Sequence, residues 1–193
     1  MKKELRMARH KMTIIHITVI LALIAWFSRV VYINKLYRVD TVYLNIGTQI
    51  DFGDFIITPI EAKRLSVNEF ENIFSIERGD DFELGIFEYD KMICLKVHIK
   101  NVTDHKLEWR DVLFVCGEGF ETSTWASACD PVLRKMINPI DDDVLNPDCE
   151  IDYWLATCVA RIAFKDSTWD TLSIEDFVFT LSLYPDSVKI KLQ

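Results

Sequence analysis

The amino-acid sequence predicts a mainly β protein, an antiparallel β-sandwich that is preceded by one N-terminal transmembrane α-helix. Three observations support this prediction. A long apolar run lies near the N-terminus, segments that alternate apolar and polar residues follow it, and the connections between these segments are mostly short. With 193 residues, of which 50% are hydrophobic, the chain is long enough to bury a single core.

The apolar run follows a basic flank at residues 1–11 and contains 17 uncharged residues from Met12 to Ser28. As a helix, this run spans roughly 25 Å, slightly less than the hydrocarbon core of a bilayer. The side chain of Arg29 can reach outward to the interface, and the apolar residues after it extend the predicted span to 12–33. The run is apolar on all sides, which distinguishes it from the amphipathic core helix of a soluble protein.

A retained signal anchor is favoured over a cleaved signal peptide. Signal peptidase requires small residues one and three positions before the cut, and neither Ala25 nor Ser28 has a small residue two positions before it. The basic flank predicts a cytoplasmic N-terminus. Residues 34–40 are then a stalk and residues 41–193 an extracytoplasmic domain of a single-pass protein of the cell membrane.

Charge is distributed unevenly along the chain. Residues 1–38 contain eight basic residues and one acidic residue, a net charge of +7, so the overall charge of −8 leaves −15 for residues 39–193. An acidic domain of this kind is repelled by nucleic acid and by anionic lipid headgroups. Nucleic acid is therefore not an expected partner.

The predicted domain begins with two strands and a short helix. Residues 41–46 and 55–60 are rich in β-branched and aromatic residues, and glycines separate them, which is typical of strands. Ser66 and Glu69 have the spacing of a capping box. We expect them to open a short helix that ends near Phe74.

The two longest predicted strands are 92–102 and 154–164. In the first, apolar residues alternate with Cys94, Lys96, His98 and Lys100, which predicts one core face and one solvent-exposed face. The second places six residues on its core face: Trp154, Ala156, Cys158, Ala160, Ile162 and Phe164. Shorter strands are predicted at 111–116, 120–125, 177–184 and 188–192.

The connection at 130–148 is longer than the others and is the candidate binding loop. It contains three prolines, a predicted helical turn at 133–137, and the consecutive residues Asp141, Asp142 and Asp143. Long loops at the end of a sandwich are common binding sites. The three aspartates match no EF-hand spacing, so a solvated acidic loop is favoured over calcium and no metal or cofactor is expected.

Three segments carry a resemblance to a known group of proteins. They are NIGTQIDFGDFIITPIEAKRL, KVHIKNVTD with its terminal Asn-Val-Thr-Asp, and FTLSLYPDSVKIKL. Together with the basic flank and the anchor, residues 41–193 resemble bacterial membrane-anchored or lipid-anchored domains of unknown function, many of them from Gram-positive gut bacteria. The resemblance implies an immunoglobulin-like β-sandwich outside the membrane, and it carries over no functional residue.

All five cysteines follow the apolar run, so an exported domain would place them where disulfides persist. An odd number leaves at least one thiol unbridged, and the pairing cannot be derived from the sequence. Cys129 and Cys149 flank the candidate loop and are candidates for a bridge that would clamp it. No CxxC pair is present, which argues against a zinc site and against thioredoxin-like chemistry.

No catalytic residue is predicted. His98 and Cys94 share a strand face, but four residues of extended chain separate them by roughly 13 Å, beyond the reach of direct proton transfer. The sequence contains no GxSxG or HExxH motif and no phosphate-binding glycine loop. The chain is therefore not expected to be an enzyme.

The expected function is that of a membrane-anchored extracytoplasmic binding or interaction module, whose partner is an unidentified protein or cell-surface ligand. One alternative is a structural subunit of a cell-envelope complex that assembles through its transmembrane helix, where Ala22, Ala25 and Ser28 supply small residues. The other is a secreted enzyme, which would require a pocket with converging polar groups.

Overall fold

The computed structural model describes residues 2–36, 40–76, 86–108, 112, 119–138, 144–182 and 187–193, with side chains from His16 onward. The chain divides into two compact units, Met1–Val39 and Asp40–Gln193. The first unit is helical and the second is mainly β, so the predicted mainly β fold with one N-terminal apolar helix is confirmed.

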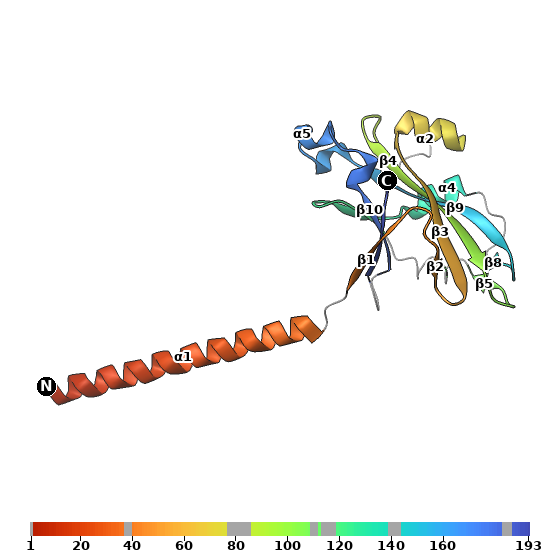
Figure 1. Cartoon of the computed structure of the whole chain (residues 1–193). Coiled ribbons are helices and arrows are strands. Elements are labelled where there is room, and N and C mark those ends of the chain that lie inside the picture. Colours follow the sequence, from red (N-terminus) through yellow and green to blue (C-terminus); the bar gives the residue numbers. More distant parts are fainter. Residues whose placement is uncertain are drawn as a thin grey trace. The chain divides into compact units, whose positions relative to one another are not determined.

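Helix α1 (Lys2–Leu36) forms the first unit (Figure 1). Its 21 residues His16–Leu36 have a mean hydropathy of 1.8, and none of the apolar window within them is buried. Exposed apolar side chains surround the helix, among them Leu21 and Val31. By length and composition this stretch is able to cross a membrane.

Three sheets make up the second unit, listed here with their strands in spatial order. The largest contains β1 (Thr41–Asn45), β11 (Ser187–Lys191), β10 (Val178–Ser182), β6 (Gly119–Glu121) and β7 (Ala126–Ala128). The second contains β2 (Ile50–Asp51), β3 (Phe55–Ser66), β4 (Lys91–Asn101) and β9 (Glu150–Val159). The smallest pairs β5 (Leu107–Glu108) with β8 (Val144–Leu145).

Strand β1 corrects the prediction of a wholly antiparallel sandwich. It pairs in parallel with β11, with Thr41 beside Ser187 and Asn45 beside Lys191. The two strands lie at opposite ends of the domain sequence, and parallel pairing is possible because the chain between them passes through both sheets. Alternation within a strand cannot report the direction of its neighbour.

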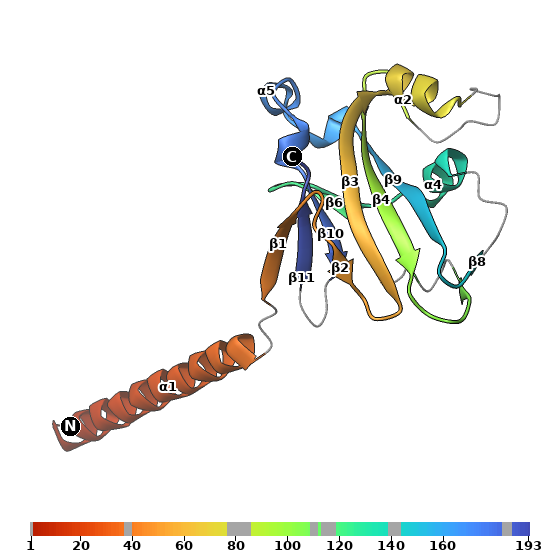
Figure 2. The same ribbon diagram turned by 45° about the vertical axis from the view of Figure 1, so that its right-hand side comes forward.

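The two larger sheets form the layers of a sandwich and share one hydrophobic core (Figures 1 and 2). Leu95 and Leu155 contribute to it from the second sheet, while Phe120 and Phe179 contribute from the largest. The rings of Phe120 and Phe179 pack edge to face, with centroids 4.9 Å apart. Burying side chains of this size stabilises the fold by about 1.5–3 kcal/mol each.

The outer face of β4 and β9 carries a second apolar cluster, beneath helices α2 (Val67–Phe74) and α4 (Pro131–Ile137). Its members are Val67, Phe70, Met92, Cys94, Leu133, Ile137 and Ala156. The predicted exposed face of β4 is therefore wrong for Cys94, which is fully buried. It holds for Lys96, His98 and Lys100, which follow where the helices no longer cover the strand.

The predicted capping box is present at the start of α2. The backbone N–H of Ser66 donates to Glu69 Oε2 at 2.7 Å, and the N–H of Glu69 donates to Ser66 Oγ at 3.3 Å. These backbone and side-chain bonds from Ser66 hold the pKa of Glu69 below its usual range. The cap fixes the point at which β3 ends and the chain turns onto the outer face of the sheet.

Helix α4 covers the outer edge of β9 and confirms the predicted helical turn. Asp130 caps it by accepting from the N–H groups of Val132 and Leu133. At its other end, the amide of Asn138 donates to the carbonyl of Trp154 and accepts from the N–H of Trp154, at 2.8 and 2.7 Å. The side chain thus replaces a neighbouring strand and satisfies an edge that would otherwise be open to pairing.

The second long strand ends earlier than predicted. Strand β9 stops at Val159, and Arg161–Ala163 forms a short 3-10 helix in which Ile162 is 95% exposed. Its faces also differ from the prediction, since Trp154, Ala156 and Cys158 pack in the second cluster instead of the main core. The alternating pattern was real, but it marked the face covered by helices.

The shorter predicted strands are placed in part. Residues 120–125 divide into β6 and the turn that leads to β7, because the chain reverses there. The predicted strands at 177–184 and 188–192 correspond to β10 and β11. The predicted strand at 111–116 lies almost wholly outside the described residues.

Asn101, the last residue of β4, is fully buried and forms a hydrogen-bond network. Its amide group donates to the carbonyls of His105, Leu145 and Asn146 at 2.9–3.1 Å. Its oxygen accepts from the backbone N–H and the hydroxyl of Thr103. The Asn-Val-Thr triplet that begins here therefore has a structural role, because it joins the end of β4 to both flanking loops.

Replacing Asn101 by Asp keeps the size of the side chain but turns its donors into a carboxylate facing three carbonyl oxygens. We expect the free energy of unfolding to fall by about 3 kcal/mol or more. Urea unfolding of the full-length protein in lipid nanodiscs, followed by tryptophan fluorescence, measures this change. Asn45→Asp makes the same chemical change on an exposed strand and should cost under about 0.5 kcal/mol; equal effects of the two variants would contradict the role of Asn101.

Candidate functional site

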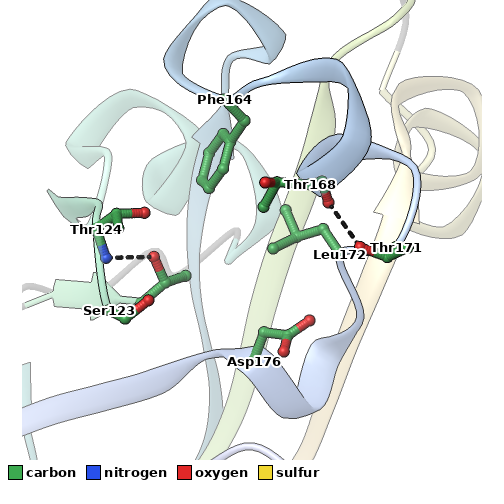
Figure 3. Close-up of a pocket in the computed structure, with 8 residues that line it drawn as sticks. Ser123, Thr124, Phe164, Thr168, Thr171, Leu172 and Asp176 are labelled. Carbon is green, nitrogen blue, oxygen red and sulfur yellow. Dashed lines mark hydrogen bonds between the residues drawn. The ribbon is translucent and has the colours of Figure 1, made fainter.

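An open pocket of about 500 Å³ lies between the β6–β7 turn and the segment that follows β9. Figure 3 shows Ser123 and Thr124 on one side of it and Phe164, Thr168 and Leu172 on the other. The pocket is lined by five hydroxyl side chains, two apolar ones and one carboxylate: Thr122, Ser123, Thr124, Thr168, Thr171, Phe164, Leu172 and Asp176. It is the candidate functional site of the described part of the domain.

The turn that forms the first wall is fixed by its own hydrogen bonds. Thr122 Oγ1 accepts from the backbone N–H groups of Thr124 and Trp125, at 3.3 and 3.1 Å. The strands on either side approach closely at Gly119, where an added Cβ would lie 2.5 Å from the carbonyl oxygen of Ser127. Glycine is therefore required for this hairpin, which holds Ser123 and Thr124 exposed at its tip.

The second wall comes from two short helices, α5 (Asp166–Trp169) and η2 (Ile174–Asp176). The hydroxyl of Thr171 donates to the carbonyls of Ser167 and Thr168. Asp176 Oδ2 accepts from the backbone N–H of Ser173 at 2.7 Å and from its hydroxyl at 3.2 Å. These local bonds hold the polar groups in place without a long side chain that would need to be ordered on binding.

Phe164 is held in position by a row of aromatic rings. Its centroid lies 6.2 Å from that of Trp125 and 6.0 Å from that of Trp169. Trp169 is buried, and the ammonium group of Lys91 lies 4.2 Å from its ring centroid while donating to its carbonyl. Burial lowers the pKa of Lys91. The aromatic wall of the pocket is thus a continuation of the rigid core.

The pocket was not predicted, because its walls come from segments about forty residues apart. Each wall has a sequence signal, a run of hydroxyl residues beside a tryptophan: Thr122 to Trp125, and Ser167 to Trp169. Such runs also occur in ordinary exposed turns. Only the pairing of β6 with β10, together with the end of β9, brings them face to face.

The predicted binding loop is partly used for structure. Helix α4 and strand β8 occupy its two ends, while Asp141, Asp142 and Asp143 lie outside the described residues. Within the described residues, no group of three or more His, Cys, Asp and Glu side chains is arranged to hold a metal ion.

The predicted bridge between Cys129 and Cys149 is wrong, since the structure does not join the two. Cys129 precedes Asp130, whose N–H donates to the carbonyl of Ala156, whereas Cys149 lies before the first residue of β9. Seven residues of extended strand, roughly 23 Å, separate these two points. A disulfide needs Cα atoms less than about 7 Å apart.

Two other thiols are inert. Burial raises the pKa of Cys94 to about 12, and burial together with the nearby Asp90 carboxylate raises the pKa of Cys158 to about 12. Asp90 is itself buried and accepts from the backbone N–H groups of Phe87 and Arg161. Neither thiol forms an appreciable amount of thiolate at neutral pH, so a nucleophilic role is disfavoured.

His98 belongs to a charged cluster on the uncovered part of β4 and β9. Its Nδ1 lies 2.8 Å from Asp152 Oδ1, and Lys96 Nζ lies 2.6 Å from Asp152 Oδ2. The hydrogen bond from Lys96, followed by the one with His98, holds the pKa of Asp152 below its usual range. Because His98 and Asp152 face each other in the strand register, the cluster is explained as cross-strand pairing.

Comparison with known proteins gives two similar solved structures. An uncharacterised β-sandwich protein from Clostridium difficile is 10% identical, with a TM-score of 0.43, and the match covers 80% of this chain and 97% of that one. A conserved hypothetical protein from Bacillus anthracis is 12% identical, with a TM-score of 0.41, and the match covers 62% and 82%. No family model matches the chain, and no curated protein matches it. At these TM-scores, neither likeness bears on the activity of this protein.

Alkylation tests the environments of the thiols. On treatment of the folded protein with iodoacetamide at mild alkaline pH, we expect exposed Cys149 to react first and Cys94 and Cys158 to react only on unfolding. Mass mapping without reduction should yield no peptide that joins Cys129 to Cys149. Rapid labelling of Cys94, or recovery of that joined peptide, would contradict the structure.

Asp152→Asn tests the charged cluster. Because folding lowers the pKa of Asp152, the carboxylate adds stability above its unfolded pKa of about 4 and loses that effect as the pH falls through the folded value. The pair is 45% exposed on the Asp152 side, so we expect a loss of only about 0.5 kcal/mol at pH 7. Unfolding at pH 7 and below pH 4 should show this difference shrinking with acid. Asp104→Asn, at a fully exposed carboxylate, is the matched control.

Proposed function

We propose that this chain is a bacterial, membrane-anchored extracytoplasmic binding module. In this proposal α1 holds the protein in the cell membrane with its N-terminus in the cytoplasm, and the β-rich unit binds a protein or another cell-surface ligand outside. The observation that carries the binding role is the pocket between the β6–β7 turn and α5, whose hydroxyls, carboxylate and aromatic ring converge on one open space.

The anchoring part of the proposal is supported by α1 and by charge. The stretch His16–Leu36 has the length and hydropathy of a membrane span. A basic flank precedes it and an acidic domain follows, which favours a cytoplasmic N-terminus. The immunoglobulin-like form and the Gram-positive origin that belong to this proposal rest on the sequence resemblance of residues 41–193.

Binding is favoured over catalysis by the chemistry of the pocket. Its lining contains hydroxyl groups and the carboxylate of Asp176, but no His, Lys or Cys side chain that would activate a hydroxyl for attack. The carboxylate also accepts two hydrogen bonds from Ser173, which occupies it as a helix cap. Nucleic acid is not a proposed partner, because residues 39–193 carry a net charge of −15.

Labelling of Cys149 tests the proposed topology. This thiol is exposed, and Cys94, which is fully buried, provides an internal control. We expect a membrane-impermeant maleimide to label the full-length protein in intact bacterial protoplasts, and Cys149→Ser to remove most of the signal. Labelling that appears only after the membrane is permeabilised would place the β-rich unit in the cytoplasm and overturn the proposal.

A further inference from the structure

We propose that the pocket binds a neutral sugar unit of a glycan. The inference deepens the proposed function and rests on it for the location of the domain, while the chemistry of recognition comes from the pocket alone. Sugars present hydroxyl groups around a ring whose C–H faces are apolar. A site for them therefore needs hydrogen-bonding side chains beside an apolar or aromatic wall, and the pocket has both.

Charge excludes two other classes of small ligand. An anion such as phosphate requires Lys, Arg or a helix N-terminus, and no cationic side chain is among the residues that line the pocket. A divalent cation requires several oxygen ligands of carboxylate or carbonyl type, and Asp176 is the single carboxylate among the lining residues. A neutral ligand with many hydroxyl groups remains.

Three hydroxyl groups of the lining are available for a ligand. Those of Ser123, Thr124 and Thr168 lie on exposed residues, and within the described part of the chain they have no hydrogen-bond partner. The hydroxyls of Thr122 and Thr171 differ, since they stabilise the turn and the α5 segment. The pocket thus separates hydroxyls that build its walls from hydroxyls that remain open to bind.

The aromatic wall is preorganised. Phe164 and Leu172 form the apolar side, across the pocket from Ser123 and Thr124 (Figure 3). Trp125 and Trp169 contact the ring of Phe164 and fix its position before any ligand arrives. A sugar ring can therefore rest its C–H face on Phe164 while its hydroxyl groups reach the β6–β7 turn. The volume of about 500 Å³ lies within the range of small-ligand sites.

Ligand-detected NMR titration of the full-length protein tests this inference. The protein is placed in lipid nanodiscs, because many mild detergents carry sugar headgroups. The probes are N-acetylchitotriose, cellotriose and maltotriose, each titrated into the millimolar range, with inorganic phosphate as the charged comparison. The open site predicts saturable binding of at least one trisaccharide, with a Kd of about 1 mM.

The key variant is Ser123→Ala combined with Thr124→Val, which removes two open hydroxyls from exposed positions and leaves the backbone turn intact. We expect it to weaken the trisaccharide about fivefold or more. The matched control is Ser167→Ala, an exposed hydroxyl on α5 outside the lining, which should bind as the unchanged protein does. A shared thermal unfolding midpoint for all three proteins verifies that they are folded.

Two results would overturn the inference. One is the absence of saturation by all three trisaccharides, and the other is binding that the double variant leaves unchanged. Phosphate binding that the double variant abolishes would also overturn it, while preserving the pocket as a ligand site. None of these results alters the labelling of Cys149, so failure of the sugar assignment and failure of the proposed topology are distinguishable.

Discussion

Strand β4 is the constraint on which the rest of the domain depends. It is hydrogen-bonded along both edges, to β3 and to β9, and it is buried on both faces over its first half. Ile93 and Leu95 face the core between the sheets, and Met92 and Cys94 face the helices. A strand buried in this way leaves no surface on which its neighbours can shift without exposing apolar side chains, so its position determines theirs.

Both ends of β4 are secured by a buried polar side chain. At the start, Asp90 accepts from the N–H groups of Phe87 and Arg161 and so joins the entry to β4 with the exit from β9. At the end, Asn101 joins the loop after β4 to the segment before β9. A buried polar group is costly without partners, and these two are stabilising because their partners are fixed backbone groups. The loops are thereby defined as closely as the strands.

The candidate pocket benefits from the same rigidity. Its aromatic wall continues the core through Trp169 and Trp125, and its polar walls are short turns closed by their own hydrogen bonds. Little conformational entropy remains to be lost when a ligand enters. The functional proposal therefore places ligand recognition on the scaffold end formed by η1, α5 and the β6–β7 turn. The long loop at 130–148 contributes structure instead, through α4 and Asn138.

The sequence by itself determined the features that depend on local periodicity and composition. These are the apolar helix, the capping box at Ser66, the helical turn after Asp130 and most of the strands, because each is encoded within about ten neighbouring residues. Tertiary structure alone decided the parallel pairing of β1, the cover over Cys94, the separation of Cys129 from Cys149, and the meeting of Thr124 with Phe164. Each of these depends on which distant segments pack together, and alternation along one strand carries no information about its partner.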